Sequence, residues 1–208
     1  MNWTDVSINK FNLLKEFLLD PENTDEERVL YQIQVLYGVN PYDFNVRDLR
    51  EYIEGIRFVT TPIPKMKVMD KYKLGDTTYI LKKKLSEFTV AQWLDWQHFI
   101  KIGSGSENYA NLLSIFFFPE GFDDYSEGYD IDKVRHDVNE HLSIADAMAI
   151  ASFFLHWHKV LLIRSLLYTL RVQLKTAKPL KMRERMRIRK EYWKAIKQIT
   201  LGDLPRLS

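Results

Sequence analysis

The chain has 208 residues, of which 46% are hydrophobic and 13% aromatic, so it can bury a substantial core. It contains no cysteine, which excludes disulfides, thiol catalysis and thiolate metal sites. Its net charge of +2 conceals an asymmetry: residues 159–208 carry 14 Lys and Arg against three acidic residues (+11), and residues 1–158 carry 16 against 25 (−9). Such a chain is suited to bind nucleic acid, an acidic surface or another copy of itself.

The N-terminal part predicts helices with clear ends. An amphipathic helix is expected over residues 4–19, ended by Pro21. Thr24 and Glu27 have the spacing of a capping box and predict the start of a second helix, which Gly38 ends.

A third helix and a β-hairpin follow. Asn45 is the expected N-cap of a helix that continues to about Arg57. Its predicted buried residues are Leu49, Tyr52, Ile53 and Ile56. Alternating apolar residues on both sides of Gly75-Asp76 predict a β-hairpin over about residues 66–82. Because an isolated hairpin is marginally stable, it must dock on the helices or pair with a neighbouring chain.

The rest of the chain returns to a helical pattern. Helices are expected over residues 89–102, 108–118, 130–142, 144–175 and 182–200. The predicted fold is therefore mainly α, a helical domain with one small β-hairpin and a basic C-terminal helical arm. Because Pro179 interrupts the pattern, the helical body is expected to comprise residues 1–178 and the basic arm residues 179–208.

One segment, Ala147–Leu174, is apolar enough to be compared with a membrane span. Charged or imidazole side chains interrupt its apolar stretches at His156, His158, Lys159, Arg164 and Arg171. Since a span needs about 20 residues with few charges, a core helix and no membrane span are expected.

No motif of catalysis or metal binding is complete. With Gly128 placed at the sixth position of a calcium loop, the twelfth position is Val134, where a bidentate Glu is required. The histidine pair at 156 and 158 does not share a helix face, and there is no His-Glu-x-x-His motif. The sequence predicts neither an enzyme nor a cofactor or metal site.

The basic terminal helix is the best candidate for a functional surface. Its expected contact residues, cationic or on an apolar stripe, are Met182, Arg183, Arg185, Met186, Arg187, Arg189, Lys190, Trp193 and Ile196. Such a helix fits a partner subunit, the phosphates of a nucleic acid or a membrane surface. The plain alternative is a solvated helix packed on its own body. Because the body is acidic, docking of the arm on the body of another subunit is electrostatically favoured.

Three parts of the sequence also resemble a known family. They are Leu30–Leu49, then Tyr72–Tyr79 with Phe88–Trp96, and finally Leu113–Gly121 with Gly128–Val134. They look like proteins from the structural gene blocks of tailed phages of gut Bacteroidetes, including crAss-like phages. The order of elements is also similar to that of phage tail-assembly chaperones.

The resemblance, which covers about Leu30–Leu155, implies a non-enzymatic component of a tailed phage particle. Such a tail or connector ring, or packaged virion protein, would act in many copies through contacts with itself or other phage structural proteins. It would be assembled in the bacterial cytoplasm and reside in the virion. The alternatives are a transient tail-assembly chaperone that binds an elongated client, and an accessory protein that binds phage DNA through the basic arm.

Overall fold

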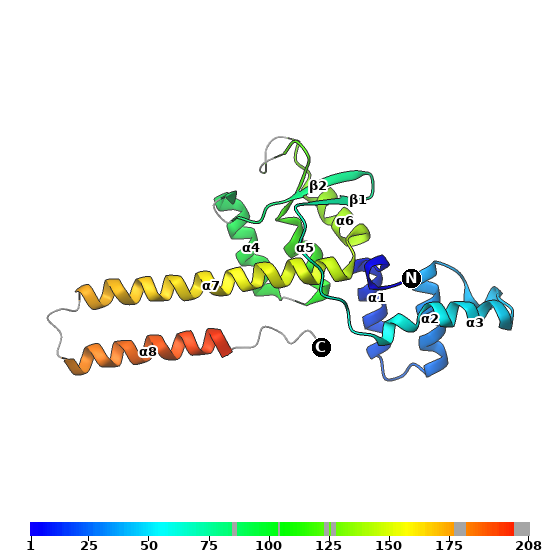
Figure 1. Cartoon of the computed structure of the whole chain (residues 1–208), viewed down its shortest axis with the longest axis horizontal. Helices are drawn as coiled ribbons and strands as arrows, with labels where there is room; N and C mark the ends of the chain where they lie inside the picture. The colour runs from blue at the N-terminus through cyan, green and yellow to red at the C-terminus, as the bar shows by residue number, and fades with distance from the viewer. Residues whose placement is uncertain (85–86, 104, 123–124, 126–127, 177–181, 202–208) are drawn as a thin grey trace. The chain divides into compact units, whose positions relative to one another are not determined.

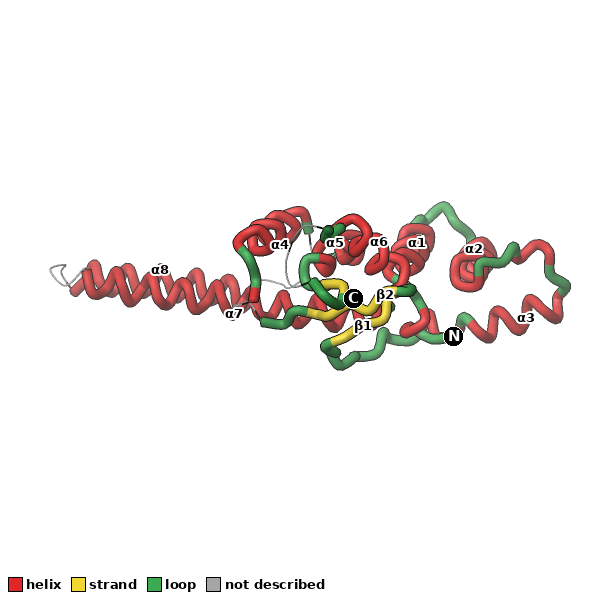
Figure 2. The backbone as a smooth tube through the Cα atoms, turned by 90° about the horizontal axis from the view of Figure 1, so that it is seen from above, coloured by secondary structure: helices red, strands yellow, loops and turns green. Residues whose placement is uncertain are grey.

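The computed structural model describes residues 1–84, 87–103, 105–122, 125, 128–176 and 182–201. Within them the chain is mainly α-helical with one three-stranded antiparallel sheet, as Figure 1 and Figure 2 show, so the predicted fold class is confirmed. The chain divides into two compact units, unit 1 (Met1–Ala151) and unit 2 (Ser152–Ser208). The boundary predicted between residues 178 and 179 lies outside the described residues.

The first helix begins later than its amphipathic pattern predicts. Helix α1 spans Ile8–Leu19, and the Ser7 hydroxyl accepts a hydrogen bond from the backbone N–H of Lys10. Residues 3–5 form a separate 3₁₀ turn. The two are separated because Ser7 pairs with Ser143 in an isolated β-bridge, which holds the backbone extended ahead of the helix.

Helices α2 (Asp25–Tyr37) and α3 (Val46–Gly55) begin and end close to their predicted positions. The Thr24–Glu27 capping box is present, and Gly38 adopts a left-handed conformation with φ of 69°. The predicted burial on α3 is wrong for Ile53, which is 37% exposed. Helix α3 packs along a narrow face instead, where Tyr52 meets Tyr37 and Phe44 with ring centroids 4.8 Å apart in both pairs.

The predicted hairpin is present but covers residues 71–81 rather than 66–82, and it gains a third strand. Strands β1 (Lys71–Leu74) and β2 (Thr77–Leu81) pair across the Gly75-Asp76 turn, where Gly75 has a φ of 58°. Strand β3 (Phe117–Pro119) pairs antiparallel with β2, and Leu81 lies opposite Phe117. The hairpin is therefore stabilised within its own chain on the β2 side.

Strand β3 replaces the end of a predicted helix. Helix α4 (Val90–Ile102) has its predicted Thr89 cap, but α5 covers only Tyr109–Ser114. The helix predicted over residues 108–118 is therefore wrong beyond Ser114. The run of Phe116, Phe117 and Phe118 favours an extended backbone and is buried against the hairpin, so tertiary pairing outweighs the local apolar pattern.

The core of unit 1 lies where this sheet meets the following helices. Helix α6 (Ile131–His141) begins at its cap Asp130, and α7 spans Ile144–Thr176. Tyr79, Phe117, Val138, Ile144 and Ile150 each have an exposed fraction of 0%. The first turns of α7 are thus core residues of unit 1.

Unit 2 consists of the remainder of α7 and helix α8 (Met182–Leu201), which run antiparallel in Figure 1. Leu170 on α7 and Ile196 on α8 are buried, with exposed fractions of 9% and 8%. The predicted helix over residues 182–200 is confirmed.

Helix α7 is also the one helix of the described chain long and apolar enough, over Ile144–Val172, to cross a membrane. The sequence predicts a core helix here, but only 17% of its most apolar stretch is buried, so that prediction holds only for the first turns. Ile144, Ala147 and Ile150 already lie in the protein core, and the charged residues named above interrupt the rest. The helix is therefore a weak indication of a span.

Candidate contact surface

The charge asymmetry of the sequence coincides with the division of the structure. Residues 152–158 carry no Lys, Arg, Asp or Glu, so unit 1 has the full net charge of −9 and unit 2 that of +11. The positive charge therefore extends beyond the predicted arm into the part of α7 that belongs to unit 2.

Helix α8 presents two different faces. Ile196 is buried, while Ile188, Tyr192, Ala195 and Ile199 are half-buried at helical spacing beside it. Met186 and Trp193, seven residues apart on another face, are 57% and 62% exposed. The expected single stripe is therefore split, because Ile196 lies about a quarter of a turn away from Met186.

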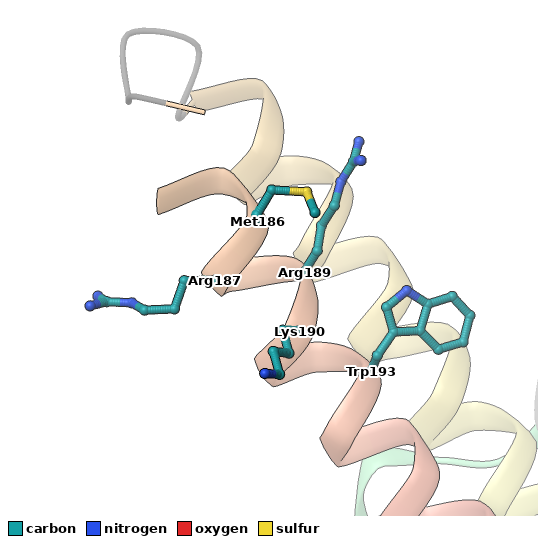
Figure 3. A pocket seen from close by; sticks show the side chains of 5 residues that line it. All are labelled: Met186, Arg187, Arg189, Lys190 and Trp193. Atoms are coloured by element: carbon teal, nitrogen blue, oxygen red, sulfur yellow. The ribbon is translucent and has the colours of Figure 1, made fainter. Parts of the chain in front are cut away.

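The exposed face borders a surface hollow of about 520 Å³. Its described lining is Met186, Arg187, Arg189, Lys190 and Trp193. In Figure 3, Arg189 and Trp193 extend to one side of the helix and Arg187 to the other. Arg187 instead lies 3.8 Å from Glu191 in an exposed ion pair. Large apolar side chains thus lie among exposed cations, a combination common at protein interfaces.

Three predicted contact residues are only partly placed. Met182, Arg183 and Arg185 belong to the first turn of α8, but their side chains lie outside the described residues. The described surface therefore rests on Met186, Arg189, Lys190 and Trp193, which we call the α8 face.

A second exposed aromatic face lies on α7 of unit 2, where the sequence predicts core packing. Trp157, Tyr168 and Val172 are 36%, 70% and 41% exposed and recur at helical spacing. Arg164 and Arg171 are exposed beside them. The cations that interrupt the apolar segment were the signal of this surface in the sequence.

Unit 1 carries a second surface hollow, about 240 Å³ in volume, between α1, α2 and the turn at Pro41–Asp43. Its lining residues are Phe17, Asn23, Glu27, Leu30, Tyr31, Gln34, Pro41 and Tyr42. Phe17 and Tyr31 stack with their ring centroids 3.9 Å apart, and Tyr42 is 76% exposed. We call this site the α1–α2 hollow.

Carboxylates are concentrated in the chain segment that contributes to the α1–α2 hollow. Residues 16–27 contain six Asp or Glu and no Lys or Arg. Glu27 lines the hollow, and hydrogen bonds from Thr24 lower its pKa, so it stays ionised. Arg28 follows and forms an ion pair with Asp25 at 3.2 Å. The segment of chain beside the hollow is therefore strongly acidic.

A buried hydrogen-bonded pair in unit 1 contributes to packing rather than to proton transfer. The Tyr79 hydroxyl donates to Asp137 Oδ2 at 2.6 Å inside unit 1. Burial and this carboxylate raise the pKa of Tyr79 above its usual range, which makes it a poor acid near neutral pH. Among the described residues, no three His, Asp or Glu side chains gather as metal ligands would. The acidic loop weighed as a calcium site lies partly outside those residues.

Comparison of the chain with protein-family models, with curated proteins and with solved structures gives no match. The resemblance to phage structural proteins therefore stays a hypothesis.

Proposed function

We propose that this chain is a non-enzymatic structural component of a tailed bacteriophage particle and works through contacts between subunits. The observation that carries the proposal is the segregation of charge, −9 on one compact unit and +11 on the other. The family resemblance supplies the setting, a virion assembled in the bacterial cytoplasm.

Physical chemistry explains why such a molecule is suited to assembly. Complementary potentials accelerate encounter and select the orientation in which surfaces meet. Large apolar side chains that become desolvated at the centre of the contact then supply most of the binding energy. Trp193 and Tyr168, both exposed within the basic unit, are residues of this kind.

Mass spectrometry of purified particles tests the proposal. A structural component should be present at a constant copy number in finished particles. Its presence only in unfinished assemblies would contradict the proposal and identify a transient chaperone. Its absence from both would remove the phage setting altogether.

A nucleic-acid-binding accessory protein is the second candidate. The exposed aromatic residues Trp157, Tyr168 and Trp193 among cations favour it, because bases stack on aromatic rings while cations bind phosphates. Fluorescence anisotropy with a labelled single-stranded oligonucleotide tests this candidate. Binding should weaken steeply with salt and be lost in Trp193→Ala together with Tyr168→Ala.

A further inference from the structure

We propose that the α8 face of one copy docks into the α1–α2 hollow of a second copy. This inference rests on the proposed function, since it names the partner and the two surfaces of the contact. The occupant of the hollow is the basic helix of an identical chain.

The α8 face has the form of a helix that binds in a groove. Met186 and Trp193 are seven residues apart, so their Cα atoms lie about 10 Å apart along the helix on the same side. Arg189 and Lys190 lie between them and are exposed. Two apolar anchors thus flank two cations on one helix face.

The α1–α2 hollow offers the complementary arrangement. The stacked rings of Phe17 and Tyr31, with Leu30 and Pro41, give it apolar walls, and Tyr42 is exposed at its edge. Glu22 and Glu26 are exposed and neighbour the lining residues Asn23 and Glu27 in sequence. One of the two apolar anchors can enter the hollow while the cations meet the neighbouring carboxylates.

Charge favours a second copy over a nucleic acid. The whole chain carries only +2, so a polyanion is weakly attracted at long range and is repelled by unit 1. A second copy brings the acidic hollow and the basic helix together, and the attraction grows as the surfaces approach. Because the two surfaces differ, copies can exchange their α8 helices in a closed pair or join head to tail in a ring or an open chain.

Site-directed disulfide formation tests which surfaces meet. Because the chain has no cysteine, Met186→Cys in one preparation and Tyr42→Cys in another introduce single thiols. Mixing the two, one of them carrying a mass tag, should give a crosslinked heterodimer under mild oxidation. Such a product can form only between copies. Leu94→Cys, which replaces another exposed apolar residue of unit 1, is the control and should give little product with Met186→Cys.

Charge reversal of the full chain gives the second readout. Arg189→Glu with Lys190→Glu should weaken self-association about tenfold or more, as should Glu22→Lys with Glu26→Lys. A mixture of the two variants, or one chain carrying all four changes, should recover association. Lys65→Glu with Lys67→Glu changes the net charge by the same amount as Arg189→Glu with Lys190→Glu. Because its two exposed positions lie outside both surfaces, it should have little effect on association. Far-UV circular dichroism verifies that each variant is folded.

The outcomes separate this contact from the wider proposal. Suppose that the wild-type chain associates, that Glu22→Lys with Glu26→Lys associates equally well, and that no crosslink forms between the thiols at positions 186 and 42. The hollow is then not the binding site, although assembly through contacts between subunits stands. If the wild-type chain is monomeric and a labelled oligonucleotide or anionic vesicle binds the α8 face, the second-copy assignment is wrong. A chain that neither associates nor binds would remove both proposals.

Discussion

The two units differ in how often their aromatic residues are exposed, although Tyr42 of unit 1 is exposed and Phe154 of unit 2 is buried. In unit 1, Tyr79, Tyr109 and Phe117 are buried to 1% exposure or less, whereas in unit 2 Tyr168 and Trp193 are 70% and 62% exposed. Buried rings stabilise the fold, and exposed rings within a basic surface are available for contacts. The comparison teaches that sequence position alone does not assign an aromatic residue to folding or to binding, since the packing partner decides.

The largest effect should come from the core of unit 1. Phe117→Ala removes a fully buried ring that packs edge-on against Tyr72 and Tyr79, so it should lower the free energy of unfolding by about 3–5 kcal/mol. Urea denaturation followed by circular dichroism measures this loss. The comparison substitution Trp193→Ala should change it by about 0.5 kcal/mol or less. Equal losses in both variants would contradict the division of roles.

The few buried residues of unit 2 should matter locally. Ile196→Ala should destabilise α8 by about 2 kcal/mol and accelerate hydrogen exchange in that helix, because a buried side chain is lost. Exchange in the sheet of unit 1 should stay unchanged. Uniform acceleration throughout the chain would show that the two units unfold as one.

The buried Tyr79–Asp137 hydrogen bond gives a smaller effect. Tyr79→Phe leaves the Asp137 carboxylate without its buried donor and should cost about 1–3 kcal/mol, measured by the same urea titration. Tyr109→Phe is the matched control, because it removes the hydroxyl of another buried tyrosine without touching Asp137. A smaller loss in Tyr79→Phe than in the control would contradict this role of the hydrogen bond.

The same tyrosines predict a dependence on alkaline pH. Burial raises the pKa of Tyr109 to about 12 and also raises that of Tyr79. Both pKa values exceed that of tyrosine in the unfolded chain, about 10, so the folded chain favours the neutral tyrosines. Their contribution to the free energy of unfolding is fully present below pH 10 and is lost as the pH rises further. The midpoint temperature of thermal unfolding should be constant from pH 8 to about pH 10 and should fall toward pH 11. The fall should be smaller in the variant that carries both Tyr79→Phe and Tyr109→Phe.

The smallest expected effect is a loss of stability at acidic pH, and it concerns unit 2. Burial lowers the pKa of His158, so below about pH 6.5 the unfolded chain binds a proton that the folded chain resists. Stability should therefore decline as the pH falls through this range. Hydrogen exchange in α7 at pH 7 and pH 5 measures the decline, which His158→Gln should reduce.

Much of the fold could be predicted from local signals. Thr24, Asn45 and Thr89 cap their helices through their own side chains, and Gly38 and Gly75 supply backbone conformations that the turns need. These interactions involve residues close together in sequence, so a single sequence reveals them.

The rest depends on contacts between distant segments. Strand β3 forms because Phe117 pairs with Leu81, more than thirty residues away, and the local pattern of residues 108–118 does not specify that partner. Likewise, the exposure of Trp193 beside the buried Ile196 depends on how α8 packs, which the apolar stripe alone leaves open. The α1–α2 hollow is lined by residues from three separate segments of the chain, so the sequence alone did not identify them as a site.

The most direct test of the central claim is sedimentation velocity of the full chain at low and high ionic strength. Raising salt from about 0.01 M to about 1 M shortens the screening length from about 30 Å to about 3 Å. If the oppositely charged units associate between copies, the chain should sediment as an oligomer at low salt and shift toward the monomer at high salt. A monomer at both ionic strengths, over the full range of protein concentration, would contradict the account.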